Sequence, residues 1–376
     1  MFKYASVNEY TMRLAFFMIL LLLFVVGCSN NVVEESVELE PIKVGVVGPF
    51  AGPIAFYGER MRDGFEMALE EINSLGGVNG RLIELVYEDD GCRPQNTVNA
   101  VHKLVEMDDV VALLGPFCGS SVKAAANLVD EKKVFLITPG DNFGKLTKYY
   151  FSTRFLIGRE GEELAKVAFE SGVRKVGVIH IDNDWAQAYI GAFGSTLRNL
   201  GGELTVVESY DYSDSDFRTR LAKISESGAD AILVLYGRGG LIFNQMRELG
   251  LNLTLLSDMA VEEPYEIQGA AGADEGVLYV YSGIVDKGFE SEFMSRYNRS
   301  SGIVNRDSYD ALMILKNALV KCENSKFNSD CLGAYVAMLR NYQGASGVLD
   351  YDSVTGGFGK VLAPKVIRNS IPMAYS

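Results

Sequence analysis

The sequence predicts an α/β fold made of two Rossmann-like open-sheet lobes, and two observations support this prediction. Strand-like and helix-like segments alternate along both halves of the chain, and most of the strand-like segments are continuously apolar. Such strands are buried on both faces, which is typical of a parallel sheet with right-handed crossovers and helices on either side. The chain has 376 residues, of which 48% are hydrophobic, so it is long enough for two domains with sizeable cores.

The first half of the chain supplies the elements of one open sheet. Residues 42–47 are a continuous apolar run, and an amphipathic segment follows in which Met61, Phe65 and Ile72 recur at helical spacing. The glycine-rich stretch LGGVNG then ends this helix. The next predicted elements are strand 82–89, helix 97–106, strand 110–115, helix 120–132 and strand 134–139.

The second half repeats the alternation. Its predicted elements are helix 158–171, strand 176–181, helix 185–200, strand 204–210, helix 216–227, strand 231–236, helix 239–251, strand 253–258 and strand 276–283. In open α/β sheets, ligands bind beyond the carboxyl ends of the strands. We therefore expect function in the loops after residues 48, 114, 138, 181, 236 and 257. Two such sheets facing each other would form a cleft.

The first 40 residues are expected to lie outside the fold. The uncharged run 14–26 would be roughly 20 Å long as a helix, which is too short for a bilayer core of about 30 Å but suits a lipoprotein signal peptide at 1–27. It ends in VVGC, which resembles the lipobox of bacterial and archaeal lipoproteins, whose cysteine carries lipid. Residues 28–40 lack an apolar period and read as an acidic, flexible tether. We expect an extracytoplasmic protein anchored through Cys28; the alternatives are an unprocessed membrane anchor or a chance cysteine.

The charge and the glycine pattern exclude two classes of partner. The formal net charge is −14, whereas a protein that binds phosphate backbones needs a basic face, so we expect no nucleic acid. The turn after the first strand has glycines at 45, 48 and 52, which is not the G-x-G-x-x-G spacing of a dinucleotide site, and no G-x-x-x-x-G-K-[ST] loop occurs. We therefore expect no nucleotide cofactor.

Motifs for catalysis and for metal binding are also missing from the sequence. His102 and His180 are the only histidines, and neither belongs to an H-E-x-x-H motif. Asp182 and Asp184 lie in HIDNDWAQA, which lacks the sixth-position glycine of a calcium loop, and no G-x-S-x-G elbow occurs. We expect neither a metal nor a catalytic residue, and an unspecific carboxylate site is the one enzymatic reading left.

Cysteine usage indicates disulfides. Apart from Cys28 the chain has four cysteines, and an exported protein lives where thiols oxidise, so we expect two disulfides. Sequence alone allows three pairings. Cys322 and Cys331 flank a polar loop between two helical patterns, and pairing them leaves Cys92 with Cys118.

Four stretches carry a resemblance to a known family: GPIAFYG, INSLGGVNGR, YEDDGC and GPFCGSS. They resemble the branched-chain amino-acid-binding family of ABC importer receptors, the type I periplasmic binding proteins, and the likeness extends over about 41–370. The resemblance implies two lobes joined by three crossovers, with the ligand in the interlobe cleft. It places lobe one at 41–156 plus 284–346 and lobe two at 157–283 plus 347–376.

The resemblance also bears on function. It implies a disulfide between Cys92 and Cys118, in agreement with the pairing above, and hinge closure on the ligand. We therefore expect a monomeric solute-binding receptor that captures a small amino-acid-like ligand and delivers it to ABC importer permease subunits. The alternative is a sensor of the same fold that acts through a signalling partner. The family binds amino acids, amides, urea and aromatic acids, so branched-chain specificity does not follow.

Lobe one is expected to hold the polar end of the ligand. Gly119, Ser120 and Ser121 follow a strand and begin a helix, where free backbone N–H groups and the helix dipole favour an anionic group such as an α-carboxylate. Helix capping alone would also select serine here. At the neighbouring strand end, the Gly140 backbone and the Asn142 side chain would add polar contacts. In the family, the position of Gly119 is a serine and the position of Asn142 is a threonine.

Aromatic and acidic side chains should complete the ligand site. By resemblance, Tyr57 covers the ligand from lobe one, although packing could also explain it, and Trp185 forms an aromatic lid from lobe two. Tyr236 ends a buried strand at a turn that the family uses for ligand contact. Asp258 is expected to bind an ammonium group. Ungapped alignment puts the acidic residue of the family at Met259, so the alternatives to Asp258 are Glu262 and Glu263, and Arg238 near the mouth could pair with a ligand carboxylate or be solvated.

Overall fold

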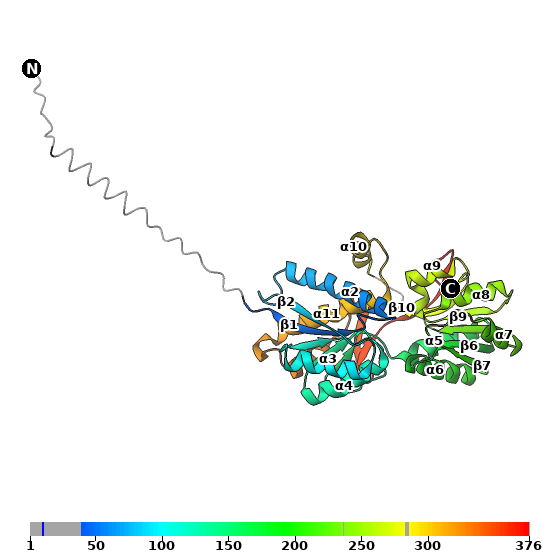
Figure 1. Cartoon of the computed structure of the whole chain (residues 1–376), viewed down its shortest axis with the longest axis horizontal. Helices are drawn as coiled ribbons and strands as arrows, with labels where there is room; N and C mark the ends of the chain where they lie inside the picture. The colour runs from blue at the N-terminus through cyan, green and yellow to red at the C-terminus, as the bar shows by residue number, and fades with distance from the viewer. Residues whose placement is uncertain (1–9, 11–38, 236, 283–285, 376) are drawn as a thin grey trace, which may run out of the picture. The chain divides into compact units, whose positions relative to one another are not determined.

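The computed structural model describes residue 10 and residues 39–235, 237–282 and 286–375 (Figure 1). Glu40–Ser376 forms one compact unit. Apart from Tyr10, the expected signal peptide lies outside the described residues, and so does Cys28. In the part of the chain that the structure describes, no helix combines the length and the apolar character needed to cross a membrane.

The first sheet contains eight strands among the described residues, in the order β11-β12-β13-β5-β4-β3-β1-β2. Pairing is parallel from β2 to β13 and antiparallel from β13 to β11, so the sheet is mixed. The strands are β1 (Ile42–Gly48), β2 (Ile83–Asp89), β3 (Ala112–Leu114), β4 (Phe135–Thr138), β5 (Tyr150–Ser152), β11 (Tyr342–Gly344), β12 (Gly347–Asp352) and β13 (Gly357–Gly359).

Helices cover both faces of this sheet (Figure 1). One face packs against α2 (Ala55–Ser74), α11 (Ile303–Cys322) and α12 (Ser329–Ala337), and the other against α3 (Pro94–Glu106) and α4 (Gly119–Lys132). The predicted helical period of α2 is confirmed, because Met61, Phe65 and Ile72 are all buried in one core. The backbones of α2 and α11 approach closely at Gly64, where a Cβ would lie 2.2 Å from the Asn305 carbonyl oxygen.

The second sheet contains seven strands among the described residues, in the order β15-β14-β10-β9-β8-β6-β7. Pairing is parallel from β7 to β10, whereas β14 and β15 add antiparallel strands. The strands are β6 (Lys175–Ile181), β7 (Glu203–Tyr210), β8 (Ala231–Leu235), β9 (Thr254–Ser257), β10 (Leu278–Ser282), β14 (Leu362–Arg368) and β15 (Ile371–Ala374).

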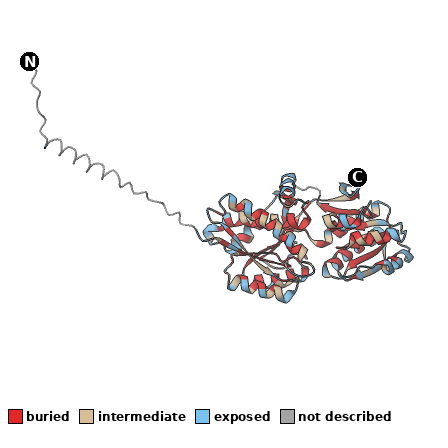
Figure 2. Cartoon of the chain, turned by 45° about the horizontal axis from the view of Figure 1, so that its top comes forward, coloured by how far each residue is buried: buried red, intermediate tan, exposed pale blue. Residues whose placement is uncertain are grey.

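The second sheet is also covered on both faces, and Figure 2 shows buried residues on its strands. One face packs against α5 (Ile157–Glu170) and α6 (Asp184–Leu200), and the other against α7 (Arg218–Glu226) and α8 (Gly239–Glu248). The remaining helices are η1 (Met259–Glu262), α9 (Pro264–Ala270), α10 (Lys287–Tyr297) and η2 (Glu323–Ser325). Two α/β lobes therefore form, each with a mixed sheet.

The described chain passes between the two sheets three times: after β5, after β10 and after β13. The last passage comes later in the chain than residue 347, where the change from lobe one to lobe two was expected. Strands β12 and β13 belong to the first sheet, where Gly357 pairs with Ser152 of β5, and the chain enters the second sheet only at β14. The physical reason is that the edge of β5 needs a partner, and β13 supplies it before the chain crosses.

Candidate functional site

A cavity of about 370 Å³ is lined by residues from both lobes. The lining residues follow the carboxyl ends of β1, β2, β3 and β4 in the first sheet and of β6 and β7 in the second. This is where open α/β sheets bind ligands. The described residues that line it are Ile54, Tyr57, Cys92, Phe117, Cys118, Gly119, Ser120, Asp141, Ile181, Asn183, Asp184, Trp185 and Tyr212.

Aromatic and disulfide groups form much of the lobe-one wall. Tyr57 lies in the first turn of α2 and stacks on Phe117, with ring centroids 4.8 Å apart. Cys92 and Cys118 form a disulfide that ties the loop after β2 to the start of α4. The second disulfide joins Cys322 to Cys331, so both pairs match the expected pairing, but this one does not line the cavity.

The serines at the start of α4 have different surroundings. Gly119 and Ser120 line the cavity, whereas Ser121 is fully buried and does not. The Ser121 Oγ lies 2.8 Å from Thr97 Oγ1, which in turn lies 2.9 Å from the carboxylate of Asp90. Ser121 therefore connects α4 to α3 and to the loop after β2, and its role in ligand binding stays a prediction without support from the cavity.

Gly140 and Asn142 are likewise held by contacts within lobe one. The Asn142 Nδ2 donates to the Arg154 carbonyl at 2.9 Å, and its Oδ1 accepts from the Gly144 N–H at 2.9 Å. The Gly140 N–H donates to Thr138 Oγ1 at 2.8 Å. A Cβ on Gly140 would lie 2.3 Å from the Phe117 carbonyl oxygen, which explains the glycine. Neither residue lines the cavity.

Asp141 lies between these two residues in sequence and does line the cavity. Burial raises the pKa of its carboxyl to about 6, while Arg154, the backbone N–H of Gly119 and Lys123 act in the opposite direction. Gly119 suits this arrangement, because a Cβ there would lie 2.5 Å from the Phe143 ring and 3.3 Å from an Asp141 carboxylate oxygen. A serine at Gly119 would therefore not fit beside Phe143.

Lobe two contributes the start of α6. Asn183 caps this helix, since its side chain accepts from the Ala186 N–H at 2.8 Å. Trp185, in the first turn, is 6% exposed and packs against Tyr189 with ring centroids 5.4 Å apart. Asp184 pairs with Lys123 of α4, with Nζ and Oδ2 2.7 Å apart, so an ion pair connects the two lobes beside the cavity. The predicted Tyr236 lies outside the described residues.

A smaller cavity of about 20 Å³ shares Tyr57, Phe117 and Trp185 with the larger one. Asp258, which is 2% exposed, lines this smaller cavity and not the larger one. Arg154 is also among its lining residues.

Carboxylates gather behind the smaller cavity. The Met259 N–H donates to Glu160 Oε1 at 2.8 Å, and burial together with the neighbouring Asp258 raises the pKa of Glu160 well above its ordinary value. Both acidic alternatives to Asp258 are already paired: Glu263 lies 2.6 Å from Arg60 Nη1, and Glu262 accepts from the Tyr279 hydroxyl at 2.6 Å.

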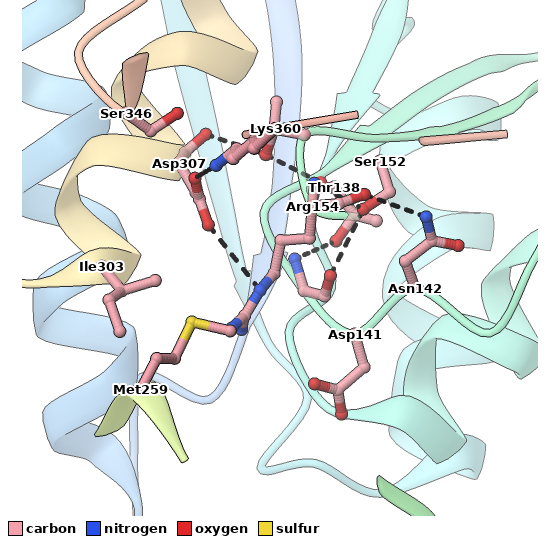
Figure 3. A network of polar contacts seen from close by, with 12 residues as sticks. Thr138, Asp141, Asn142, Ser152, Arg154, Met259, Ile303, Asp307, Ser346 and Lys360 are labelled. Carbon is pink, nitrogen blue, oxygen red and sulfur yellow. Dashed lines mark hydrogen bonds and ion pairs between the residues drawn. The ribbon is translucent and has the colours of Figure 1, made fainter. Parts of the chain in front are cut away.

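A network of polar contacts lies at two of the passages between the lobes (Figure 3). Arg154 follows β5, and its Nε lies 3.7 Å from an Asp307 oxygen of α11. Asp307 also pairs with Lys360, which follows β13. Figure 3 shows Arg154 reaching past Asp307 to Met259, where Nη2 lies 3.4 Å from the sulfur. Arg154 and Lys360 therefore meet one carboxylate of α11.

Several cavity residues were not predicted from the sequence. Phe117, Asp141 and Asp184 follow the strands that end at 114, 138 and 181, so the strand ends were predicted correctly but not these side chains. Tyr212 follows β7, whose carboxyl end was not among the expected loops. Arg238 does not line the larger cavity, and its Nε donates to the Tyr212 carbonyl at 3.1 Å.

Curated relatives match most of the chain. Residues 41–356 match the family model described as periplasmic binding protein. An amino acid binding protein of Pseudomonas aeruginosa is 31% identical over 300 residues, which cover 74% of this chain and 79% of that protein. The leucine-, isoleucine-, valine-, threonine-, and alanine-binding protein of the same organism is 28% identical over 316 residues, which cover 80% and 83%.

Solved structures agree in fold. A leucine-binding protein from Thermotoga maritima superposes with a TM-score of 0.79 at 24% identity, covering 89% of this chain and 98% of that one. A solute-binding protein from Rhodopseudomonas palustris BisB5, in complex with 3,4-dihydroxybenzoic acid, gives 0.80 at 21% identity, covering 89% and 96%. These relatives are solute-binding proteins and not enzymes. The chain belongs to the branched-chain amino-acid-binding family of type I periplasmic binding proteins, the substrate-binding proteins of ABC transporters.

Proposed function

We propose that this protein is an extracytoplasmic receptor that captures a small, amino-acid-like ligand and delivers it to the permease subunits of an ABC importer. The observation that carries the proposal is the cavity of about 370 Å³, lined from both lobes at the carboxyl ends of their strands. Its size falls in the range of about 300–1,000 Å³ that is usual for small-molecule sites. Tyr57, Gly119, Ser120 and Trp185 are the predicted ligand contacts that line it.

Hinge closure of the two lobes around the ligand is part of the proposal. The passages between the sheets are few, and such connections act as hinges when two rigid bodies close on a ligand. Two ion pairs connect the lobes beside the site: Lys123 with Asp184 at 2.7 Å, and Arg60 with Glu263 at 2.6 Å. Asp258 lines the smaller cavity and not the larger one, and we propose that closure brings the ligand toward it.

We also propose attachment to the membrane through lipid on Cys28, with residues 28–40 as the tether, and a monomeric receptor. The VVGC sequence supports lipidation, and the acidic composition of 28–40 supports a flexible tether. Labelling of the full-length chain with a radioactive fatty acid should succeed, and Cys28→Ala should abolish it. Label retained in the variant would refute the anchor.

The receptor role is tested by ligand-induced closure. Spin labels placed by cysteine substitution at the exposed Met107 in lobe one and Leu249 in lobe two report the distance between the lobes. We expect at least one compound from a panel of amino acids, amides, amines and aromatic acids to raise the melting temperature and to change this distance. A compound that binds the folded state at a hundredfold excess over Kd stabilises it by about 2.7 kcal/mol. No response to any compound would refute the receptor role.

A further inference from the structure

The larger cavity combines aromatic rings with carboxylates. Four of its described lining residues are aromatic, namely Tyr57, Phe117, Trp185 and Tyr212. Two more, Ile54 and Ile181, are aliphatic. Its described charged residues are Asp141 and Asp184, and none of the described lining residues is Lys, Arg or His. Aromatic faces and carboxylates attract organic cations, whereas they offer nothing to an anion.

Of the two carboxylates, Asp184 already has a partner in Lys123, with Nζ 2.7 Å from Oδ2, and its side chain is 62% exposed, so water screens its charge. The second nearby cation, Arg154, contacts Asp307 and Met259. Both cations lower the pKa of Asp141 and so favour its ionised form, but their ion pairs are with other carboxylates. Asp141 therefore carries the charge in this cavity that a ligand cation can compensate.

Asp141 also occupies the place where a ligand carboxylate would bind. The start of α4 is the natural anion site of lobe one, because its first N–H groups lack partners within the helix. The N–H of Gly119, the first residue of α4, interacts with the Asp141 carboxylate. A carboxylate on the ligand would have to lie beside that of Asp141, and two like charges at such close range repel each other.

We infer that the cavity binds an organic ammonium ion with an apolar body and no carboxylate, with Asp141 as the counter-ion and the rings of Tyr57, Phe117 and Trp185 around the cation. This inference rests on the proposed receptor function and specifies its substrate class as amines. A phenyl or branched alkyl group of the ligand would contact Ile54 and Ile181.

Two series of three compounds test the inference on the full-length chain in detergent, by isothermal titration calorimetry. The first is 3-methylbutylamine, leucine and 4-methylpentanoate, and the second is phenylethylamine, phenylalanine and 3-phenylpropanoate. Within each series the apolar body is shared, and only the ammonium and carboxylate groups change. We expect the amine of at least one series to bind at least tenfold more tightly than the amino acid, and the acid not to bind.

Variants of Asp141 identify the counter-ion. Asp141→Asn should weaken amine binding at least tenfold, and Asp141→Glu, which keeps the charge, should weaken it less. Asp274→Asn is the matched control, because Asp274 is a buried carboxylate of lobe two that does not line the cavity. The affinity of this variant for the amine should stay within twofold of that of the unchanged chain. The ranking of the three compounds on the unchanged chain needs no variant, so it tests the inference even if Asp141→Asn does not fold.

The outcomes separate this inference from the proposed function. An amino acid that binds more tightly than its amine and closes the lobes would overturn the inference and leave the receptor role intact. Tight binding of the acids would overturn it as well and would point to Arg154. If none of the six compounds binds, the inference is overturned too. The receptor role is then decided separately, by the melting temperature and the interlobe distance measured with the wider panel of compounds.

Discussion

Lys360 and Asp307 form an ion pair in which each side chain is only 2% exposed. Lys360 lies on the passage between β13 and β14, and Asp307 lies in α11 of lobe one, where Arg154 from the passage after β5 also approaches it. The Asp307 carboxylate thus contacts residues from two of the three passages between the lobes. Removing one partner of such a pair leaves a buried charge without compensation, which is strongly destabilising.

Substitution of Asp307 by Asn should therefore lower the free energy of unfolding by about 3–5 kcal/mol, because Lys360 and Arg154 lose their ion-pair partner while Lys360 stays buried. Urea unfolding of the two chains measures this difference. Asp330→Asn is the matched control, since Asp330 pairs with Lys148 in an ion pair whose side chains are 65% and 66% exposed, and water screens such a pair. Equal losses in the two variants would contradict a special role for Asp307.

The two disulfides should contribute similarly to stability but differently to binding. Their sequence separations are 26 and 9 residues, and the chain-entropy model assigns about 3 kcal/mol to each. Cys92 and Cys118 line the cavity, so replacing both by Ala should also weaken ligand binding. The double variant of Cys322 and Cys331 should lose stability but keep its ligand affinity, and calorimetry of both variants checks this. Unchanged affinity in the first variant would show that the disulfide does not shape the site.

Titration of Asp141 should affect stability and amine binding in opposite directions. Burial raises its pKa to about 6, above an ordinary value of about 3.9, so the folded state holds the proton more tightly. The contribution to stability is present below about pH 4 and is lost as the pH rises through 6. Binding of an amine needs the ionised carboxylate, so the affinity should rise over the same window and level off above it.

The measurement is the dissociation constant of the amine between pH 5 and pH 8. At pH 5, one unit below the pKa, we expect about tenfold weaker binding than on the plateau. Asp141→Asn should remove most of this dependence, which separates it from the titration of Glu160 behind the smaller cavity. An unchanged pH profile in that variant would assign the dependence to Glu160.

Trp185 makes binding visible without a label. It is the only tryptophan of the chain, it is nearly buried, and it lines both cavities. A ligand in the site should therefore change the intensity or the wavelength of tryptophan emission in proportion to occupancy. The Trp185→Phe variant should keep an aromatic face and bind within about tenfold of the original affinity while losing the signal. If calorimetry detects binding of a ligand but the tryptophan emission does not change, that ligand binds outside the cavity lined by Trp185.

The fold could be predicted largely from periodicity. The apolar spacing in α2 and the continuous apolar strands β1 and β8 reflect burial that the structure confirms. Short elements were missed: β5 has only three residues, and its place in the sheet depends on main-chain pairing with β4 and β13. The change of lobe after β13 was missed for the same reason, since the main-chain pairing of Gly357 with Ser152 does not depend on any recognisable sequence pattern.

The site could be predicted as a set of loops more easily than as a set of side chains. Asn142 and Ser121 are polar residues at strand ends, but both satisfy hydrogen bonds within lobe one. Asp141 was not predicted although it is next to Asn142, because sequence does not show which of two adjacent side chains points into a cavity. The replacement of serine by Gly119 was the visible sign, since Phe143 and Asp141 fill the space that a Cβ would need.

The two ends of the compact unit belong to different lobes. Strand β1, directly after the proposed tether, lies in the first sheet, and β15, at the carboxyl end, is the edge strand of the second. If residues 28–40 attach the protein to the bilayer, lobe one is the lobe next to the anchor, and lobe two moves relative to it about the passages after β5, β10 and β13. A fluorophore fused after Ser376 would then move with lobe two. Its distance from the membrane would change each time the protein binds or releases a ligand.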